Sequence, residues 1–538
     1  MRLPLHQAPV ALAVLAGMAA TLPARAFAAP ATTSAPAPTS SRAQLQAECD
    51  QLLRAAVKTP FGWGWPAGAI STSPDPSAAP PRAPRAARVT RSATIDTRTT
   101  ATAGLALHLA GRRLGKPEYA AAAVQAARVL SAVQANSGQV PASGVIRASA
   151  GGNDPPAAVP SRAATCSSLA LLLTVLHDAE VSPAAPADVS ADADPDADAA
   201  VAQVRSLRPA ALKAANWLAK QKTRRGGWPV EYVPTPPSGA AAKTARPLRL
   251  IRLDRPDARD ATFCLWLAAS VLNDAGLRRH AELAGEELSV LRIAERKSLA
   301  QNLWAAAYDL DDTPIKTVAE LPYGVDTAAT DYAMQALLAA SLLGDGDAAG
   351  PVLKEAVTAL GALPKRDGKW LRYYAPSLEA AAEPPRESGE AQDPAEPPVA
   401  PVQPVTPTVD TASESQVFNP DPADADDPAA PLSLPQTIAA AGRLADLGPE
   451  RYAEALAATV PVEHRLAMAI CGLDENALTS EPPTDPAGIR QYLERYQGEF
   501  RLLESPPPDD VFTRVQRLGL LLRRVQLEPT GGEMGVKP

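Results

Sequence analysis

Residues 94–134 read TIDTRTTATAGLALHLAGRRLGKPEYAAAAVQAARVLSAVQ, and this stretch decides the fold. Between residues 94 and 112 the apolar residues recur every three or four positions, which places them on one face of a helix. Gly115-Lys116-Pro117-Glu118 interrupts the pattern, and a second helical pattern covers 119–134. The stretch therefore predicts two helices joined by a short turn that contains glycine.

The same scheme recurs along the chain. The recurring helix pairs are expected at 162–177 with 198–221, 257–273 with 276–304, and 325–343 with 347–363, and more helices follow at 434–526. A single helical hairpin cannot bury its apolar face, so hairpins of this kind stack into a solenoid or close into a toroid. The glycine–tryptophan loops at 61–66 and 225–229 favour closure around a cleft. We predict an all-α protein, an α/α-toroid in the form of an incomplete or closed barrel of helical hairpins.

The N-terminus has the three parts of a secretory signal peptide: the basic start Met1-Arg2-Leu3, a short apolar run at 8–22, and the small-residue exit Ala24-Arg25-Ala26. The apolar run is too short to span a bilayer comfortably, although an uncleaved anchor is the alternative. No later stretch is expected to be long and apolar enough to cross a membrane. We predict an exported protein, periplasmic or secreted.

Low-complexity segments rich in proline, alanine or acidic residues are expected to be disordered, because they cannot bury a core. The predicted organisation is a signal peptide at 1–28, a linker at 29–42, a toroid domain at 43–376 with disordered insertions near 72–90 and 181–199, an acidic linker at 377–431, a helical segment at 432–527 and a tail at 528–538.

Composition excludes several classes of function. The net charge of −7 gives no attraction to nucleic acid or to an anionic membrane. The four cysteines are far apart and lie in apolar helical contexts, which predicts mostly buried free thiols rather than a zinc site. His108 and His177 lie within helical patterns and are expected to be structural.

Four segments occur in the order and rough spacing of those in the family 10 pectate lyases, which are α/α-toroid enzymes, and the resemblance covers about residues 60–375. The segments are Thr94-Ile95-Asp96 after a Gly-Trp-Gly loop, Gly226-Gly227-Trp228-Pro229 with Thr262-Phe263, Trp304 with Tyr308-Asp309 and Ala319-Glu320-Leu321-Pro322, and Gly368-Lys369-Trp370-Leu371-Arg372-Tyr373-Tyr374. The chain thus resembles that family.

The resemblance implies β-elimination on an acidic polysaccharide, with a calcium ion that neutralises the substrate carboxylate and an arginine that takes the C5 proton. It implies Asp96 as a metal-binding or other site carboxylate, with an N-terminal helix cap as the alternative. Arg372 would hold a substrate carboxylate, and Lys316 approximates a basic residue near the turn. Sugar-stacking candidates are Trp63, Trp65, Trp228 and Trp370, with plugs between repeats as the alternative.

The sequence also departs from the family. After Thr-Phe the family continues with Asn-Asp-Asp, whereas this chain has Cys264-Leu265-Trp266. Asp260 lies upstream and is the remaining candidate for a second calcium ligand. Two alternatives therefore stay open. One is an inactive toroid that binds glycan or protein. The other is a terpene-cyclase-like protein, because Asp309-Leu310-Asp311-Asp312-Thr313 fits the D-x-D-D-T pattern of those enzymes, although 4 % aromatic residues suits carbocation chemistry poorly.

Overall fold

A computed structural model gives the fold of the chain. It describes residues 40–66, 92–147, 161–181, 195–232, 247–294, 298, 300–315, 324–344, 349–374, 430–480, 483, 485–505 and 510–527. Met1–Ser40 and Ser41–Pro538 are two compact units, and the account below concerns the second. The predicted signal peptide, the insertion near 72–90, nearly all of the acidic linker and the tail lie outside the described residues.

The first predicted hairpin consists of helix α2 (Thr97–Leu114) and helix α3 (Pro117–Val133). Asp96 caps the start of α2, and Gly115 ends it in the left-handed conformation, with φ of 68°. Helix α2 is buried from Thr97 through Gly111 except at Arg98, whereas α3 is buried along one face. This difference identifies α2 as an inner helix and α3 as an outer one.

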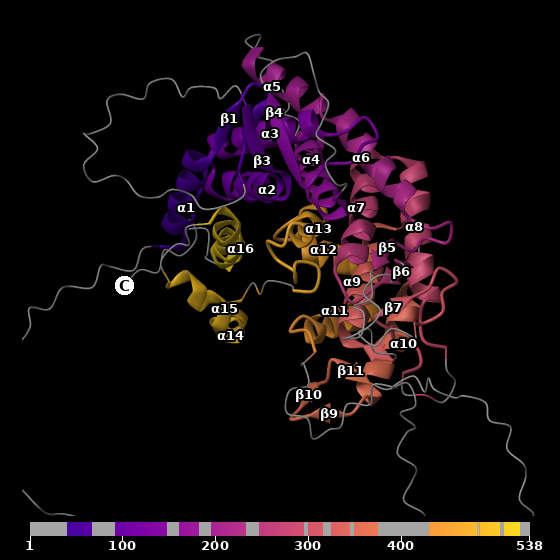
Figure 1. The fold of residues 1–538 in the computed structure, drawn as a ribbon. Coiled ribbons are helices and arrows are strands. Elements are labelled where there is room, and N and C mark those ends of the chain that lie inside the picture. The colour runs from indigo at the N-terminus through magenta and orange to yellow at the C-terminus, as the bar shows by residue number, and fades with distance from the viewer. Residues whose placement is uncertain are drawn as a thin grey trace, which may run out of the picture. The chain divides into compact units, whose positions relative to one another are not determined.

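Three further pairs repeat this arrangement. They are α4 (Arg162–Val181) with α6 (Arg208–Gln221), α7 (Asp257–Leu272) with α8 (Ala275–Val290), and α9 (Thr327–Leu343) with α10 (Ala349–Ala362). The inner helices α2, α4, α7 and α9 contact one another in that order, and the outer helices pack behind them (Figure 1). The chain is an all-α protein with an α/α-toroid fold, as predicted.

Short antiparallel strands, which the helical periodicity did not predict, precede or follow the inner helices. Their pairs are β1 (Val57–Thr59) with β2 (Gly62–Gly64), β3 (Ser92–Asp96) with β4 (Ser143–Arg147), β5 (Pro229–Tyr232) with β6 (Leu248–Arg252) and β7 (Ala307–Tyr308), β8 (Val325–Asp326) with β11 (Tyr373–Tyr374), and β9 (Lys365–Arg366) with β10 (Lys369–Trp370). Two of these strands, β3 and β8, lead directly into the inner helices α2 and α9.

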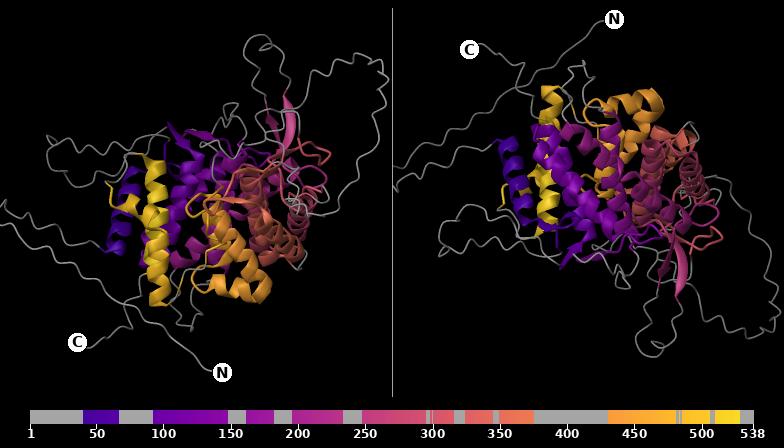
Figure 2. Two further views of the ribbon diagram at one scale, coloured as in Figure 1. Left: turned by 90° about the horizontal axis from the view of Figure 1, so that it is seen from below. Right: turned by 90° about the horizontal axis from the view of Figure 1, so that it is seen from above.

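The C-terminal helices belong to the same compact unit. They are α11 (Leu434–Leu447), α12 (Pro449–Ala457), α13 (Val462–Ile470), α14 (Pro486–Arg495), α15 (Gln497–Phe500) and α16 (Val511–Leu527), with α1 (Ser41–Ala55) beside α16 (Figure 2). Helix α11 packs on α9 and α10, and α16 packs on α1 and α2. The last helices therefore extend the arc at both of its ends.

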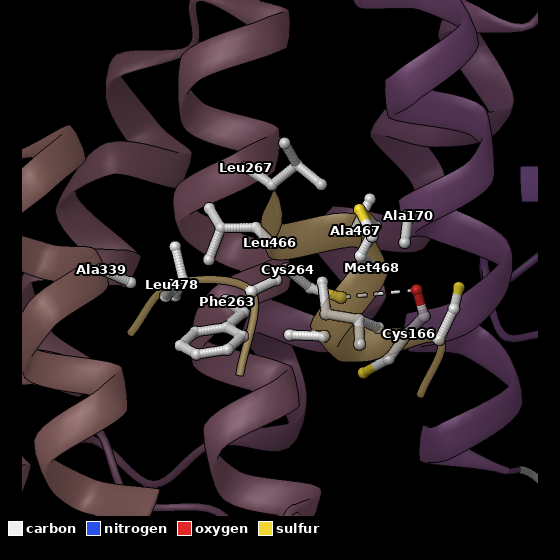
Figure 3. Close-up of a cluster of buried hydrophobic side chains, with 14 of the residues drawn as sticks. Cys166, Ala170, Phe263, Cys264, Leu267, Ala339, Leu466, Ala467, Met468 and Leu478 are labelled. Atoms are coloured by element: carbon white, nitrogen blue, oxygen red, sulfur yellow. Dashed lines mark hydrogen bonds between the residues drawn. The ribbon is translucent and has the colours of Figure 1, made fainter. Parts of the chain in front are cut away.

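Helix α13 lies inside the arc, in contact with α4 and α7. Its side chains Leu466 and Met468 are buried beside Phe263 and Cys264 of α7 and Cys166 of α4 (Figure 3). The interior of the toroid is thus filled by protein in this region.

Three helix boundaries and the expectation about membrane spans differ from the structure. Helix α8 ends at Val290 rather than near 304, because a loop and β7 follow it. Helix α5 (Pro195–Arg205) begins inside the predicted insertion at 181–199, and α1 begins inside the predicted linker at 29–42. Helix α4 is long and apolar enough to span a membrane, contrary to expectation, but 72 % of its apolar window is buried within the toroid. Because most of this window is buried, α4 is a core helix of the toroid.

Gly226 shows why a loop of this toroid requires glycine. Its φ is +129°, and a Cβ there would lie 2.2 Å from the carbonyl oxygen of Leu283 on α8. We expect Gly226→Ala to lower the free energy of unfolding by about 2 kcal/mol or more in urea denaturation, through backbone strain and overlap. Gly361→Ala in α10 is the matched control, because no atom lies within 4 Å of a Cβ there. Equal losses in both variants would contradict this account.

All four cysteines are buried and free. Burial raises the pKa of the Cys471 thiol to about 12 and that of Cys264 well above its usual value. Because the thiolate is the reactive form, we expect a thiol reagent such as Ellman's reagent to react slowly with the native protein. It should titrate four thiols in denaturant without reductant. A smaller number under those conditions would indicate a disulfide.

Candidate functional site

The first turns of the inner helices lie on one face of the toroid, which we call the N-terminal face. The Thr97 hydroxyl of α2 donates to the carbonyl oxygen of Ala142, at 2.9 Å, in the loop that leads to α4. Arg162 of α4 donates to Pro229 O, at 2.7 Å, in the segment that leads to α7. Each inner helix thus starts beside the loop that introduces its neighbour, and the positive ends of the helix dipoles share this face.

Asp96 lies on the N-terminal face as the cap of α2. Its Oδ1 accepts the backbone N–H of Thr99 at 2.6 Å. The cap predicted as the alternative role of this residue is therefore present. Asp326, which the sequence analysis did not select, caps α9 in the same way by accepting from Ala328 and Ala329. The signal that could have revealed Asp326 is the repeated pattern Asp-Thr-x-x-Thr, which occurs at 96–100 and at 326–330.

Arg372 binds the Asp326 cap with two nitrogen atoms. Its Nε and Nη2 lie 2.9 and 3.3 Å from the two carboxylate oxygens of Asp326, whose side chain is fully buried. Burial raises the pKa of Asp326, and Arg372 opposes that rise. About a quarter of the Arg372 side chain remains exposed, at 24 %. The residue that was expected to hold a substrate carboxylate therefore already holds a carboxylate of the protein.

Asp260 lies in the first turn of α7 and pairs with its neighbour Arg259. The Nη2 of Arg259 lies 2.8 Å from Asp260 Oδ1, and the carboxyl side chain is 15 % exposed. Burial raises the pKa of Asp260 to about 6, although the charges of Arg259 and Arg98 oppose the shift. A partly exposed carboxyl group that titrates near neutrality can transfer protons.

Asp96 and Asp260, the carboxylates predicted to bind calcium, each contact a group of the protein. Calcium takes six to eight oxygen ligands, whereas Asp96 is bonded to a helix N–H and Asp260 to an arginine. In the part of the chain that the structure describes, neither residue belongs to a group of three side chains close enough to share an ion. Lys316 lies outside the described residues.

The tryptophans chosen as sugar-stacking candidates mostly contact the protein. Trp65 is fully buried and its indole donates to Leu52 O at 2.9 Å, while Trp228 is 2 % exposed and donates to the Thr262 hydroxyl at 3.2 Å. Trp370 is half-buried and donates to Leu360 O at 2.9 Å. Trp63 is also half-buried, with the Lys58 ammonium 4.8 Å from its ring. Trp65 and Trp228 are plugs between repeats, which was the alternative role.

A belt of arginines and tyrosines crosses the N-terminal face. We define the arginine–tyrosine belt as Arg98, Arg252, Arg259, Tyr332, Arg372 and Tyr373. The Arg259 guanidinium lies 4.9 Å from the Tyr332 ring and that of Arg372 lies 5.4 Å from the Tyr373 ring. Arg372 also acts electrostatically on Tyr332, and Arg252 acts on Tyr373. Burial raises the pKa of both tyrosines, so their hydroxyl groups stay protonated at neutral pH.

The C-terminal segment borders this belt. The exposed Glu475 carboxylate interacts electrostatically with both Arg259 and Tyr332 and raises the pKa of each. Asp331 of α9, which is fully buried, accepts a hydrogen bond from the Thr437 hydroxyl at 2.5 Å. The N-terminal face is therefore built jointly by the inner helices and by residues beyond the acidic linker.

The acidic motif at 309–313 forms a surface turn after β7. Asp309 Oδ1 accepts the backbone N–H groups of Asp311 and Thr313, each at 2.9 Å, and Leu310 is 39 % exposed. Asp312 forms an ion pair with Arg225. These contacts hold the turn together, and the Asp312 side chain is only 10 % exposed.

No family model matches this chain, and no curated protein matches it. Among solved structures it is similar to a cellobiose 2-epimerase from Bacillus thermoamylovorans B4167 (10 % identity, 62 % of this chain and 74 % of that one, TM-score 0.36). It is also similar to a cellobiose 2-epimerase from Spirochaeta thermophila DSM 6192 (16 % identity, 60 % of this chain and 73 % of that one, TM-score 0.32). A third similar structure is a D-mannose isomerase (11 % identity, 91 % of this chain and 100 % of that one, TM-score 0.39).

The titration of Asp260 can be tested through stability. The pKa of Asp260 is higher in the folded protein than in the unfolded chain. Its contribution to the free energy of unfolding is therefore present at acidic pH, below the unfolded pKa, and is lost as the pH rises through about 6. Relative to Asp260→Asn, the wild type should lose about 2 kcal/mol of unfolding free energy between pH 4 and pH 7.5. Urea denaturation at a series of pH values measures this difference. A difference that does not change with pH would place the pKa at its ordinary value.

Proposed function

We propose that the protein is an exported binding protein for an acidic sugar polymer, which it holds on the arginine–tyrosine belt. The observation that carries the proposal is the belt itself, in which the Arg259 guanidinium lies beside the Tyr332 ring and the Arg372 guanidinium lies beside the Tyr373 ring. The pattern of a signal peptide at 1–28 supports export.

The chemistry of the belt suits a polymer of uronic acids. A guanidinium binds a carboxylate through two parallel hydrogen bonds, and a tyrosine offers both a ring face to a sugar and a hydroxyl donor. The dipoles of the inner helices add positive potential at the same face. Because Asp254, Asp257 and Asp260 lie among the arginines, we expect the belt to select a spaced row of carboxylates rather than a dense anion.

Two features favour binding over calcium-dependent elimination. Asp96 and Asp260 each have a partner within the protein, so a metal ion would first have to displace it. Helix α13 also fills the interior of the arc beside α4 and α7. The belt arginines are paired as well, Arg259 with Asp260 and Arg372 with Asp326, and a sugar carboxylate would bind at the exposed part of the Arg372 side chain.

A binding experiment with matched ligands and variants tests the proposal. Isothermal titration calorimetry with oligogalacturonate should give saturable binding, whereas the methyl-esterified oligomer should not bind, because it has lost its charge. We expect Arg252→Gln and Arg372→Gln each to weaken binding about tenfold or more, as expected for loss of one charged hydrogen-bonded contact. Arg279→Gln on the outer helix α8 is the control, because it pairs only with surface glutamates.

Circular dichroism establishes that each variant is folded, which matters most for Arg372→Gln because Asp326 is buried. Equal affinity for the esterified and the acidic oligomer would overturn the proposal. The same samples, assayed by ultraviolet absorbance for unsaturated uronate with calcium and with chelator, should give no product. Product that requires calcium would instead establish a lyase. Product that is independent of calcium but lost in Asp260→Asn would indicate proton transfer by that carboxyl group.

A further inference from the structure

Three of the five histidines of the chain meet at one carboxylate, far from the arginine–tyrosine belt. His108 comes from the later part of α2, His177 and Asp178 from the last turns of α4, and His464 from the first turn of α13. These positions place the cluster toward the face of the toroid opposite the N-terminal face. His108 and His177 were predicted to be structural. Their proximity to His464 was not predicted, because His464 lies 286 positions from Asp178 in the sequence.

The contacts at Asp178 are short and numerous. Its Oδ1 lies 2.9 Å from His464 Nε2, 3.3 Å from His177 Nδ1 and 2.6 Å from Arg112 Nη1. Its Oδ2 lies 2.6 Å from His108 Nε2. Both carboxylate oxygens of Asp178 therefore contact histidine nitrogens, and Asp178 is the centre of the cluster.

We propose that His177, Asp178 and His464 form a binding site for a divalent transition metal of the zinc class. Their ligand atoms lie within 4.8 Å of one another. A tetrahedral zinc ion with bonds of about 2.0–2.1 Å separates its ligand atoms by roughly 3.3 Å. The observed separations of Asp178 Oδ1 from the two histidine nitrogens, 2.9 and 3.3 Å, are close to that value.

The groups behind these ligands are also those of a metal site. Zinc-binding histidines usually point their second nitrogen at a carboxylate, and zinc-binding carboxylates are themselves hydrogen-bonded. Here His177 Nε2 lies 3.8 Å from Glu463 Oε2, and Glu463 Oε1 accepts from Ser270 at 3.1 Å. His108 contacts the second oxygen of Asp178. The ligands are thus oriented from α2, α7 and α13.

A cavity of about 190 Å³ adjoins one of the three proposed ligands, His464, and is lined by Leu109, Arg112, Arg113, Pro461 and others. Three protein ligands and one open position characterise zinc ions that bind water or a small anion, and Arg112 and Arg113 would favour an anion there. The Arg112 side chain is 49 % exposed, so it can move into solvent and release Asp178 Oδ1 to the metal.

Cobalt binding tests the site directly. Tag-free protein is dialysed against chelator, dialysed free of it, and titrated with Co²⁺, whose visible absorption reports tetrahedral coordination. We expect one equivalent to bind with a strong visible band, Zn²⁺ to displace it, and Zn²⁺ to raise the midpoint of thermal unfolding, because the metal links α13 to α4. Absence of the band in protein with native circular dichroism would overturn the proposal.

Matched variants assign the ligands. Asp178→Asn and His464→Gln should each weaken cobalt binding at least tenfold, whereas His280→Gln on the outer helix α8 should leave it unchanged. If those two variants do not fold, Arg112→Gln decides the question, because it keeps every ligand and removes the competing cation. It should tighten binding severalfold. Binding unaffected by Arg112→Gln, or abolished by His280→Gln, would place the metal elsewhere.

Discussion

Each inner helix of the toroid is buried on nearly every side, and its first turn must therefore find polar partners within the chain. Asp96 and Asp326 supply some of them by accepting backbone N–H groups of α2 and α9. Threonine hydroxyls in the first turns of the inner helices then bind the neighbouring loops. Thr100, Thr165 and Thr330 accept the backbone N–H groups of Trp65, Val140 and Trp304 at 3.0, 2.9 and 3.3 Å. The position of each loop on the N-terminal face is fixed by these bonds, and the belt and the caps lie on the same loops and first turns. The face that carries the candidate site is thus a consequence of satisfying helix starts in a buried ring.

The same requirement explains the fate of the residues that resembled a lyase site. Asp96 and Asp326 cap buried helices, and Arg372 neutralises the second of these caps. A carboxylate at such a position stabilises the fold whether or not a ligand is ever bound. At the position that follows Thr262-Phe263, Cys264 is buried beside α13 (Figure 3).

The sequence predicted the parts of this protein that depend on local pattern. Helical periodicity revealed the hairpins, and the apolar contexts of the cysteines predicted buried thiols, because both signals lie within a few turns of helix. The strands escaped prediction because they are two to five residues long and owe their pairing to the helices that hold them. Asp178 and His464 are 286 positions apart, and the pairing of Arg372 with Asp326 depends on a cap that was not recognised. No local pattern reports contacts of that kind.

The contact between the first and last helices sets the order in which the molecule can be completed. Glu48 of α1 is buried against Arg514 and Arg517 of α16, and 466 positions separate Glu48 from Arg514. At about 5–20 residues per second, a ribosome needs roughly 20 to 90 seconds to cover that distance. Throughout that interval Glu48 lacks its cationic partners. The burial of Glu48 is therefore one of the last steps in completing the fold, because it cannot occur before α16 has been synthesised.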